Sequence, residues 1–413
     1  MAQPTKPRRK TRKVRLDVDL IGAVTGYGSA GRVTSAHHRL AKHYCSPLLF
    51  GPPSSEDVLA LIVHAFTEDE ADVAQHLPPL RPRLPSKVAR VTGRSVADVT
   101  AVLEHLANHK RVLFAAGSPR RYAIVPLIPG TLEMTLMRPE VAGLTDWHKG
   151  FVERFKRVWD TGFITRYVSF ARAPVRYLPV GGVVDTLYSA CPSDKLEEIL
   201  APYDRFAVGQ CICRISARLL GDGCDKPLGN CSFYGPMADD AVERGWAGLV
   251  DREELIARKR DAEEHGCVTW MVNEVGDPQG NVSCSCCGCC CHALKTVNQF
   301  NAPGAISRPR YLPELDKGTC NLCGKCARQC PMGAWKVIGA QLYFDRVRCI
   351  GCGICVVTCK PKALTLRAMP EPEPVAQSWG GLLTKLAPDL AANAFKAWAG
   401  RLFGPGGLGP FRR

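Results

Sequence analysis

The stretch from Cys320 to Cys359 contains two cysteine quartets with the same spacing. They are Cys320-x2-Cys323-x2-Cys326-x3-Cys330-Pro331 and Cys349-x2-Cys352-x2-Cys355-x3-Cys359. A two-residue spacing lets a tight loop direct successive thiolates toward one iron–sulfur cube, while the fourth cysteine lies past a turn and reaches the neighbouring cube. We therefore predict that Cys320, Cys323, Cys326 and Cys359 bind one [4Fe-4S] cluster, and that Cys349, Cys352, Cys355 and Cys330 bind the other.

The segment from about Gly318 to Leu364 resembles the bacterial-type two-cluster ferredoxin. The resemblance implies a small pseudo-symmetric β/α fold that carries one electron at a time, with the two quartets as an internal repeat. One departure from the repeat is that Lys360, rather than a proline, follows Cys359. A different turn and an altered cluster potential are expected there. The alternative, a pair of zinc knuckles, is disfavoured because the eight cysteines form two interleaving quartets.

The composition is that of a soluble globular protein with two or three domains. The 413 residues are 46% hydrophobic and 23% charged, but 21 cysteines are unusual. Eight fit the two quartets and six crowd into positions 284 to 291, where pairwise disulfides do not fit. This usage indicates a reducing compartment, and we expect a cytoplasmic protein of an anaerobe.

Targeting signals do not change that expectation. No apolar run approaches the length of about 20 residues that crosses a bilayer. The Arg8-Arg9 pair is followed by more basic residues and has only a brief apolar run, Leu20 to Val24, so it does not read as an export signal.

The formal net charge is +15, and each oxidised four-cysteine cluster would lower it by about two. Seven basic residues lie in the first fifteen positions, so much of the excess is an N-terminal arm. Such an arm suits contact with nucleic acid, an anionic membrane or an acidic partner, or it is simply solvated. We assign residues 1–53 to this arm and to a glycine loop.

The glycine loop is Gly26-Tyr27-Gly28-Ser29-Ala30-Gly31, preceded by a predicted strand from Leu16 to Val24. The pattern is that of a dinucleotide-binding loop, in which glycines let the backbone approach a pyrophosphate. A second strand should follow the next helix, but Pro47 and Gly51-Pro52-Pro53 stand there instead. A flexible glycine loop is therefore the favoured interpretation.

Residues 54–126 are predicted to form a winged-helix-like domain. Helical patterns at about 54–65, 68–77, 86–91 and 95–109 precede strand-like runs at 112–114 and 121–125. The last helix would expose two carboxylates, Asp98 and Glu104, which repel phosphates. DNA binding therefore remains a prediction that is less favoured than docking to a protein, although basic residues flank the helix.

Residues 127–310 are predicted to form a cysteine-rich iron–sulfur domain. Aromatic residues recur every four positions from Trp147 to Phe163, which indicates core packing. Ten cysteines follow: Cys211, Cys213, Cys224, Cys231, Cys284, Cys286, Cys287, Cys289, Cys290 and Cys291. The first four suffice for a third [4Fe-4S] cluster, and four of the last six would hold a fourth. Because adjacent cysteines in an extended chain point to opposite sides, the two sets can also share ligands.

Three alternatives apply to these ten cysteines. Zinc bound by the first four suits the Cys-x-Cys spacing. A larger or unusual cluster bridging both sets, or redox disulfides within the last six, are the others. Arg214 is expected either to donate hydrogen bonds to cluster sulfurs or to pair with an acidic residue. Cys45, Cys191 and Cys267 stand apart and are expected to be ordinary buried residues.

The whole order resembles a set of large ferredoxin-like proteins of anaerobic bacteria and archaea. They share a winged helix, a Cys-x-Cys-Arg segment, a cysteine-packed run and a two-cluster ferredoxin, and the resemblance covers about positions 54 to 365. It implies an α+β multidomain protein with the ferredoxin domain at 311–368. Residues 369–413 form a linker and a weakly amphipathic tail, predicted to break near Pro388 and to pack on protein or lie on a membrane surface.

The sequence therefore predicts an iron–sulfur electron-transfer protein. Two ferredoxin [4Fe-4S] clusters, with one or two further clusters in the middle domain, would carry electrons to a partner oxidoreductase. A redox-sensing DNA-binding regulator and an enzyme that reduces a substrate at the middle clusters are the alternatives. The sequence shows no arrangement of residues that requires catalysis.

Overall fold

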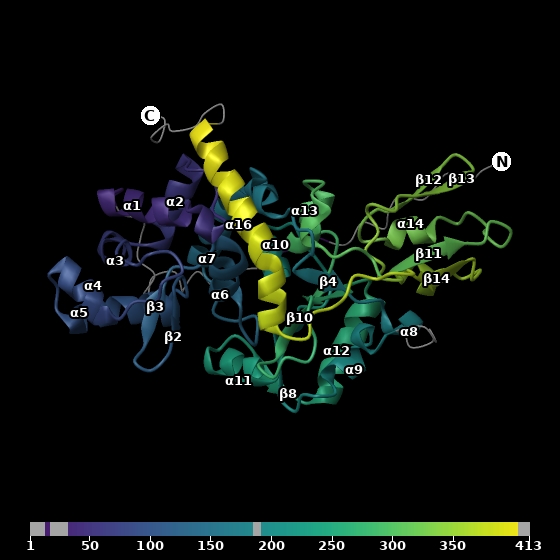
Figure 1. Cartoon of the computed structure of the whole chain (residues 1–413), viewed down its shortest axis with the longest axis horizontal. Helices are drawn as coiled ribbons and strands as arrows, with labels where there is room; N and C mark the ends of the chain where they lie inside the picture. Colours follow the sequence, from purple (N-terminus) through teal and green to yellow (C-terminus); the bar gives the residue numbers. More distant parts are fainter. Residues whose placement is uncertain (1–12, 17–31, 185–190, 404–413) are drawn as a thin grey trace. The chain divides into compact units, whose positions relative to one another are not determined.

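The computed structural model describes residues 13–16, 32–184 and 191–403. They belong to two compact units, each drawn in Figure 1. We call Leu16–Met137, Val141–Tyr167 and Leu390–Arg413 the helical unit, and Met1–Arg15, Arg138–Glu140 and Val168–Asp389 the cysteine unit. The glycine loop, the strand predicted before it and most of the basic arm lie outside the described residues.

The helical unit consists mainly of short helices. These are α1 (Ser35–Tyr44), α2 (Glu56–Ala65), α3 (Glu68–Ala74), α4 (Pro85–Thr92), α5 (Val96–Glu104), α6 (Leu132–Leu136) and α7 (Asp146–Asp160). A π-helical turn, His105–His109, continues α5, and β2 (Phe114–Ala116) then pairs with β3 (Arg121–Ala123) in a hairpin. Helices thus precede a hairpin, and the identification of this order as a winged helix stays a prediction.

The core of the helical unit is aromatic and contains one buried ion pair. Trp147, Phe151, Phe155 and Trp159 of α7 are all buried, which confirms the predicted core packing. Lys110, after the π-helical turn, is fully buried and its Nζ lies 2.6 Å from the Glu70 carboxylate of α3. A buried charge requires such a partner. The unit also includes residues 141–167, which the sequence-based division assigns to the cysteine-rich domain.

The cysteine unit is built on a six-stranded antiparallel sheet. Its strand order is β4 (Val175–Tyr177), β9 (Val268–Val272), β10 (Asn281–Cys286), β7 (Gly229–Tyr234), β5 (Phe206–Gln210) and β8 (Gly248–Val250). Helix α12 (Arg252–Glu264) packs against four of these strands. Asp251 caps this helix by accepting from the Glu254 N–H at 2.7 Å.

Shorter elements complete this part of the cysteine unit. They are β1 (Lys13–Val14) paired with β6 (Gly223–Cys224), and the helices α8 (Gly181–Val184), α9 (Leu196–Leu200), α10 (Ile212–Leu219), α11 (Pro236–Glu243) and α13 (His292–Asn298). Side chains alternate between the two faces of a strand. Cys284 and Cys286 of β10 therefore share one face, and Ser283 and Ser285 share the other.

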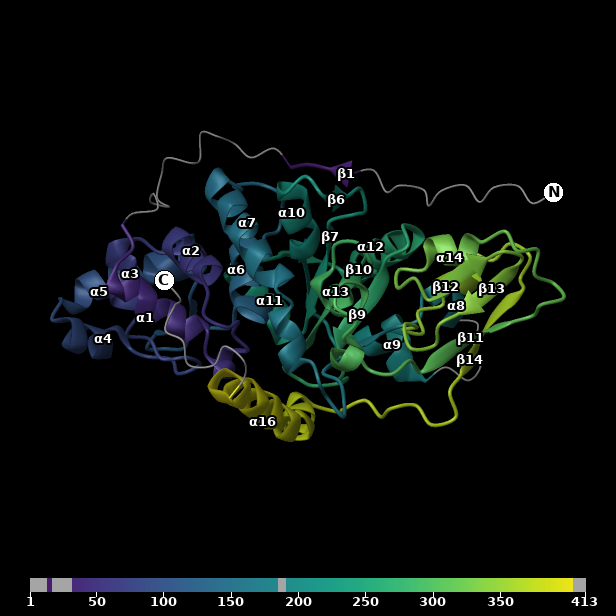
Figure 2. The same ribbon diagram turned by 90° about the horizontal axis from the view of Figure 1, so that it is seen from above.

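The ferredoxin-like residues form two small sheets and two short helices within the same unit. Figure 2 shows β11 (Tyr311–Leu315) beside β14 (Leu364–Ala368), and β12 (Trp335–Ile338) paired with β13 (Gln341–Phe344). Helices α14 (Lys325–Gln329) and α15 (Ile354–Val357) lie in equivalent positions of the two halves, which agrees with the internal repeat. Each begins after a glycine with positive φ, Gly324 or Gly353, in a conformation that favours glycine.

The C-terminal helix differs from the sequence-based expectation. Helix α16 runs from Trp379 to Phe403 without a break at Pro388, so the predicted interruption is wrong. Proline removes one backbone donor, but packing on both sides of it offsets that loss. Leu382 and Leu386 are buried before the proline, and Asn393 is buried after it. Among the described residues, no helix is both long enough and apolar enough to cross a bilayer.

Candidate metal centres

The ferredoxin-like residues enclose two cysteine-lined pockets. The first is lined by Cys320, Cys323, Cys326 and Cys359, and the second by Cys330, Cys349, Cys352 and Cys355. Each pocket is partly open to solvent. The eight cysteines thus divide into the same two sets that the spacing predicts. Four thiols around a cavity, with apolar residues between them, fit the donor set of a four-iron cube.

The two pockets differ in exposure. Cys323 is exposed at the first pocket, whereas Cys330, Cys352 and Cys355 are buried at the second. Burial raises the pKa of Cys349 to about 11 and that of Cys355 to about 12. These thiols are therefore neutral without metal at neutral pH, and binding a cluster would release their protons.

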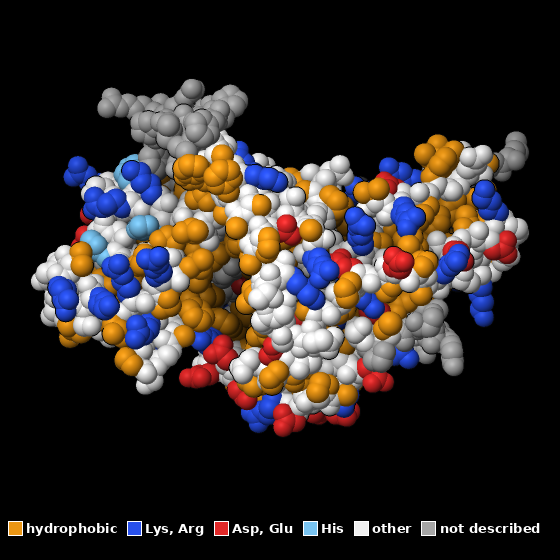
Figure 3. Space-filling view, viewed as in Figure 1, with side chains coloured by type: hydrophobic (Ala, Val, Ile, Leu, Met, Phe, Trp, Pro, Cys, Tyr) orange, Lys and Arg blue, Asp and Glu red, His pale blue; other side chains and the backbone are white. Residues whose placement is uncertain are grey.

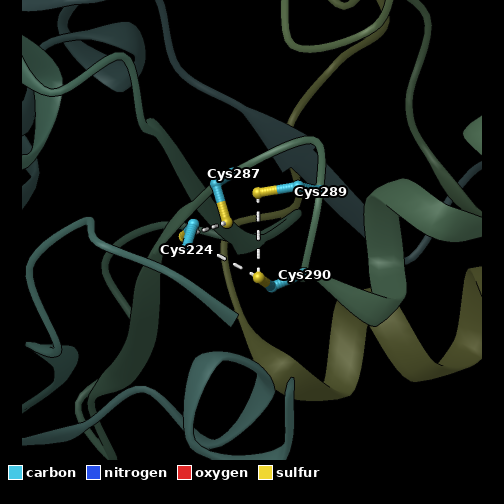
Figure 4. Close-up of side chains that lie close together, drawn as sticks. All are labelled: Cys224, Cys287, Cys289 and Cys290. Carbon is cyan, nitrogen blue, oxygen red and sulfur yellow. Dashed lines mark hydrogen bonds between the residues drawn. The ribbon is translucent and has the colours of Figure 1, made fainter. Parts of the chain in front are cut away.

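Four of the ten middle-domain cysteines form a compact group that we call the closed quartet. Cys224, Cys287, Cys289 and Cys290 have their sulfur atoms within 4.8 Å of one another. In Figure 4 the four side chains point toward a common centre, from β6 and from the loop between β10 and α13. The Cys224 sulfur lies 3.8 Å from that of Cys287 and 3.7 Å from that of Cys290. The Cys289 and Cys290 sulfurs are also 3.7 Å apart.

The other six cysteines, the six-cysteine group, lie around the amino ends of α10 and α13 and on β7 and β10. They are Cys211, Cys213, Cys231, Cys284, Cys286 and Cys291. The Cys291 sulfur is 3.2 Å from that of Cys286, and the Cys231 and Cys284 sulfurs are 3.8 Å apart. The thiols of Cys211 and Cys291 raise the pKa of Cys213 well above its usual value, and His292 Nδ1 lies 3.3 Å from the Cys213 sulfur.

The structure does not keep Cys211, Cys213, Cys224 and Cys231 together. It mixes the two sequence-based sets, which is the arrangement that the alternative of shared ligands allows. Cys224 and Cys231 have their nearest thiol partners in the later run, and not in Cys211 and Cys213. Neighbours within the run separate: Cys287 and Cys290 join the closed quartet, while Cys286 and Cys291 contact each other. The sequence could not assign these partners because the chain folds back between positions 231 and 284.

The lone cysteines meet the expectation of ordinary buried residues only in part. Cys191 is exposed. Cys267 is buried, but it shares a core with Cys224, Cys287 and Cys290. The Arg214 Nη1 donates to its sulfur at 3.6 Å. Cys267 is therefore part of the surroundings of the closed quartet, which a lone cysteine in the sequence does not reveal.

Two buried cations flank the thiols. Arg214 is fully buried and donates to Ser285 O at 3.0 Å and to Asn230 Oδ1 at 2.8 Å. Lys259 of α12 is fully buried and donates to Asn230 O at 3.1 Å. Within the described ranges neither forms an ion pair with a carboxylate. Of the two kinds of partner expected for Arg214, an acidic residue is thus not found in the part of the chain that the structure describes.

Negative charge on the cysteines is the main way to balance these cations, and the Glu263 carboxylate adds a weaker contribution at Lys259. Burial lowers the pKa of Arg214, but the thiols of Cys211, Cys267 and Cys287 outweigh it and raise that pKa well above its usual value. Burial lowers the pKa of Lys259, and thiols of the six-cysteine group, with Cys284 the largest contributor, act against it. A buried cation needs a buried anion, and thiolates that bind metal supply one.

Residues of the second pocket contact the loop of the closed quartet. A Cβ added at Gly288 would lie 2.0 Å from the carbonyl oxygen of Pro331, so the two backbones approach closely. Asn298 of α13 donates to Gly288 O at 3.1 Å and to Pro331 O at 3.0 Å. Arg348 in turn donates to Asn298 Oδ1 at 2.9 Å. Gly288 lies between two closed-quartet cysteines and Pro331 follows Cys330, so this contact joins two candidate metal centres.

Comparison with known proteins supports part of this picture. Residues 312–364 match the family described as the 4Fe-4S dicluster domain. A subunit of the ion-translocating oxidoreductase complex of Methanosarcina acetivorans is 42% identical over 48 residues. That match covers 12% of this chain and 18% of the relative, so the chain spans only a small part of the relative's length. No solved structure matches the chain. The prediction of a ferredoxin-type [4Fe-4S] domain is confirmed.

Proposed function

We propose that this protein transfers electrons between a partner oxidoreductase and a third [4Fe-4S] cluster in the six-cysteine group, by way of its ferredoxin domain. The observation that carries the proposal is a shared core. Cys286 and Cys291 of the six-cysteine group belong to the same buried cluster of side chains as Cys326, Cys330, Cys352 and Cys355 of the two pockets. A continuous packed interior between redox centres keeps them close and excludes water.

The ligands proposed for the third cluster are Cys211, Cys213, Cys286 and Cys291. Cys286 and Cys291 are in direct contact, and the Cys211 and Cys213 thiols each shift the pKa of the other. Cys211 and Cys213 precede or begin α10, and Cys291 is the N-terminal cap residue of α13, so helix dipoles favour negative charge there. The Cys213 and Cys286 thiols hold the pKa of Cys291 well below its usual range. Such a thiol is ready to bind metal as a thiolate.

The bound clusters would supply reversible one-electron redox chemistry, and the chain sets its conditions. The buried charges of Arg214 and Lys259 stabilise an added negative charge on the six-cysteine side, which raises the reduction potential there. At the other end, the exposed Cys323 places the first pocket within reach of a partner. The order of exposure therefore suits exchange with a partner at the first pocket and storage of charge at the buried end.

The partner side of the ferredoxin domain carries exposed apolar residues. Leu322 lines the first pocket and is exposed, as are Ile338 and Tyr343 on β12 and β13. In Figure 3 this domain, on the right, displays apolar side chains among basic and acidic ones. Exposed apolar side chains ringed by charge suit transient docking. The relative's name places it in an ion-translocating oxidoreductase complex, and we propose an oxidoreductase partner of the same general kind here.

The helical unit offers little support for the alternative of a DNA-binding regulator. Glu104 of α5 accepts from the Tyr122 hydroxyl and from the Asn108 amide, and it pairs with Arg120 at 3.4 Å. A carboxylate held at this position opposes phosphate contact. DNA binding, membrane contact by the tail and substrate reduction at the middle domain remain predictions.

Iron and acid-labile sulfide content tests the proposal, on anaerobically purified full-length chain. Three cubes predict about twelve irons per chain. Cys286→Ser should lose about four of them and leave the ferredoxin signals in electron paramagnetic resonance spectra. The exposed Cys191→Ser is the matched control and should lose none. A wild-type content of about eight irons that Cys286→Ser leaves unchanged would overturn the third cluster.

A further inference from the structure

The closed quartet has the geometry of a single-ion site. A regular tetrahedron of thiolates about one Zn²⁺, with Zn–S bonds of about 2.3 Å, has S–S edges of about 3.8 Å. Three edges of the quartet measure 3.7, 3.7 and 3.8 Å, and none of the six exceeds 4.8 Å. A four-iron cube places iron and sulfide atoms between its thiolates and therefore needs a cavity, such as each ferredoxin pocket provides.

We propose that Cys224, Cys287, Cys289 and Cys290 bind one tetrahedral divalent ion of the Zn²⁺ class, separate from every iron–sulfur cluster of the chain. Four thiolates complete the coordination shell and leave no open position, which makes the site structural and not catalytic. The proposal goes beyond electron transfer, because zinc has no redox chemistry and adds no centre to the electron path.

The surroundings fit a closed, buried ion. Cys224, Cys287 and Cys290 are buried together with Cys267 and with Ala262 of α12 in one small core. Four thiolates and a divalent ion carry a net charge of about −2. The buried Arg214, which donates to the Cys267 sulfur at 3.6 Å and contacts the Cys287 thiol, balances part of that charge. Such an outer partner is a usual companion of a metal–thiolate site.

The position of the site suggests what the ion does. Cys224 ends β6, while the other three ligands belong to the loop between β10 and α13. An ion bound by all four therefore fixes that loop to a distant part of the chain. The same loop carries Gly288, whose backbone abuts Pro331 beside the second pocket. The ion would hold the six-cysteine group and the second pocket in a fixed relation.

Two neighbouring cysteines provide a matched test. Cys290→Ser removes a ligand of the closed quartet, and Cys291→Ser removes a ligand of the six-cysteine group. Zinc and iron are measured on full-length protein purified anaerobically from medium that contains both metals. We expect about one zinc per chain in the wild type, its loss from Cys290→Ser with iron unchanged, and its retention in Cys291→Ser. Cys289→Ser, at an exposed ligand, repeats the first test with less risk to folding.

Two outcomes would overturn the zinc proposal. One is loss of about four irons, with no zinc in any sample, from both Cys290→Ser and Cys289→Ser, which would make the quartet a cube site. The other is retention of zinc in both variants. Growth with Co²⁺ gives a second readout, because tetrahedral thiolate-bound cobalt has intense visible bands that Cys289→Ser should abolish. Failure of the third iron–sulfur cluster would instead appear as iron unchanged in Cys291→Ser, so the two proposals fail separately.

Discussion

The ferredoxin domain and the closed quartet use the same donor atom in opposite ways. In the first, eight thiols line two pockets that are partly open to solvent, and the cysteine spacing predicts the members of each set. In the second, four thiols close to within 4.8 Å, and one of them comes from a segment more than sixty positions away. The number of cysteines therefore indicates that a metal is bound. The space between their thiols indicates which kind of metal centre they hold.

The largest expected effect concerns the pockets of the ferredoxin domain. Cys352→Ser replaces a buried ligand of the second pocket and should remove about four irons per chain, because a cube held by three thiolates and a hydroxyl is poorly retained. Iron and sulfide analysis measures the loss, and zinc should stay. Simultaneous loss of zinc would show that the pockets and the quartet are not independent.

Removal of a buried cation is expected to come next. Arg214→Met keeps much of the side-chain volume but leaves the nearby thiolates without their counter-charge. Breaking a buried charge pair costs about 3–5 kcal/mol. The urea midpoint for loss of visible cluster absorbance should fall accordingly.

Arg205→Met is the matched control for that cation. Arg205 forms an exposed pair with Asp239, in which both side chains are 51% accessible. Such a pair contributes about 0–1 kcal/mol, so the urea midpoint of Arg205→Met should hardly differ from that of the wild type. Equal shifts in the two variants would contradict the charge-balancing role of Arg214.

A smaller effect is expected where the two kinds of site meet. Gly288→Ala places a Cβ 2.0 Å from Pro331 O, and the backbones must separate. Overpacking of this kind costs about 1–3 kcal/mol. Iron and zinc should be retained, while transfer of electrons from reduced viologen to the third cluster slows, as followed by stopped-flow absorbance.

Gly248→Ala is the control for that contact. Its added Cβ would meet Pro139 Cβ at 3.7 Å, an ordinary van der Waals distance. Its transfer rate should match that of the wild type. An unchanged rate in Gly288→Ala would remove the loop contact from the electron path.

The smallest effect concerns the end of β10 that carries no cysteine. Buried Glu274 accepts from Asn281, and burial raises its pKa from 4.5 to about 7. Between these values the folded protein keeps a proton that the unfolded chain releases, so stability should fall as pH rises through this window. Glu274→Gln should reduce the change of the urea midpoint between pH 5 and 7. An unchanged pH dependence would show that other groups control stability in this window.

The sequence predicted the ferredoxin domain because every ligand set follows from spacing within forty residues. The aromatic spacing from Trp147 to Phe163 likewise predicted core packing, since a helical period is a local pattern. The partners of Cys224 and Cys231 could not be predicted, because the sheet register that brings them to the later run is set by tertiary packing. Cys267 belongs to no sequence motif. Only the core that it shares with Cys224, Cys287 and Cys290 shows that it lies beside the closed quartet.

The C-terminal helix is a second case in which a local pattern gave the wrong prediction. Pro388 predicted a break because proline removes a backbone hydrogen bond, a local penalty. Buried Leu382, Leu386 and Asn393 outweigh that penalty through contacts that no local pattern in the tail displays. The grouping of Cys211 and Cys213 with Cys224 and Cys231, and the break at Pro388, were both expected from local patterns. Distant contacts override both.

Zinc-edge X-ray absorption of the anaerobically purified full-length chain tests the central contrast most directly. We predict a zinc shell of four sulfurs at about 2.3 Å with no metal scatterer behind it, beside iron that shows the short iron–iron distances of cubes. A chain that contains iron alone, or zinc with oxygen or nitrogen ligands, would contradict the account.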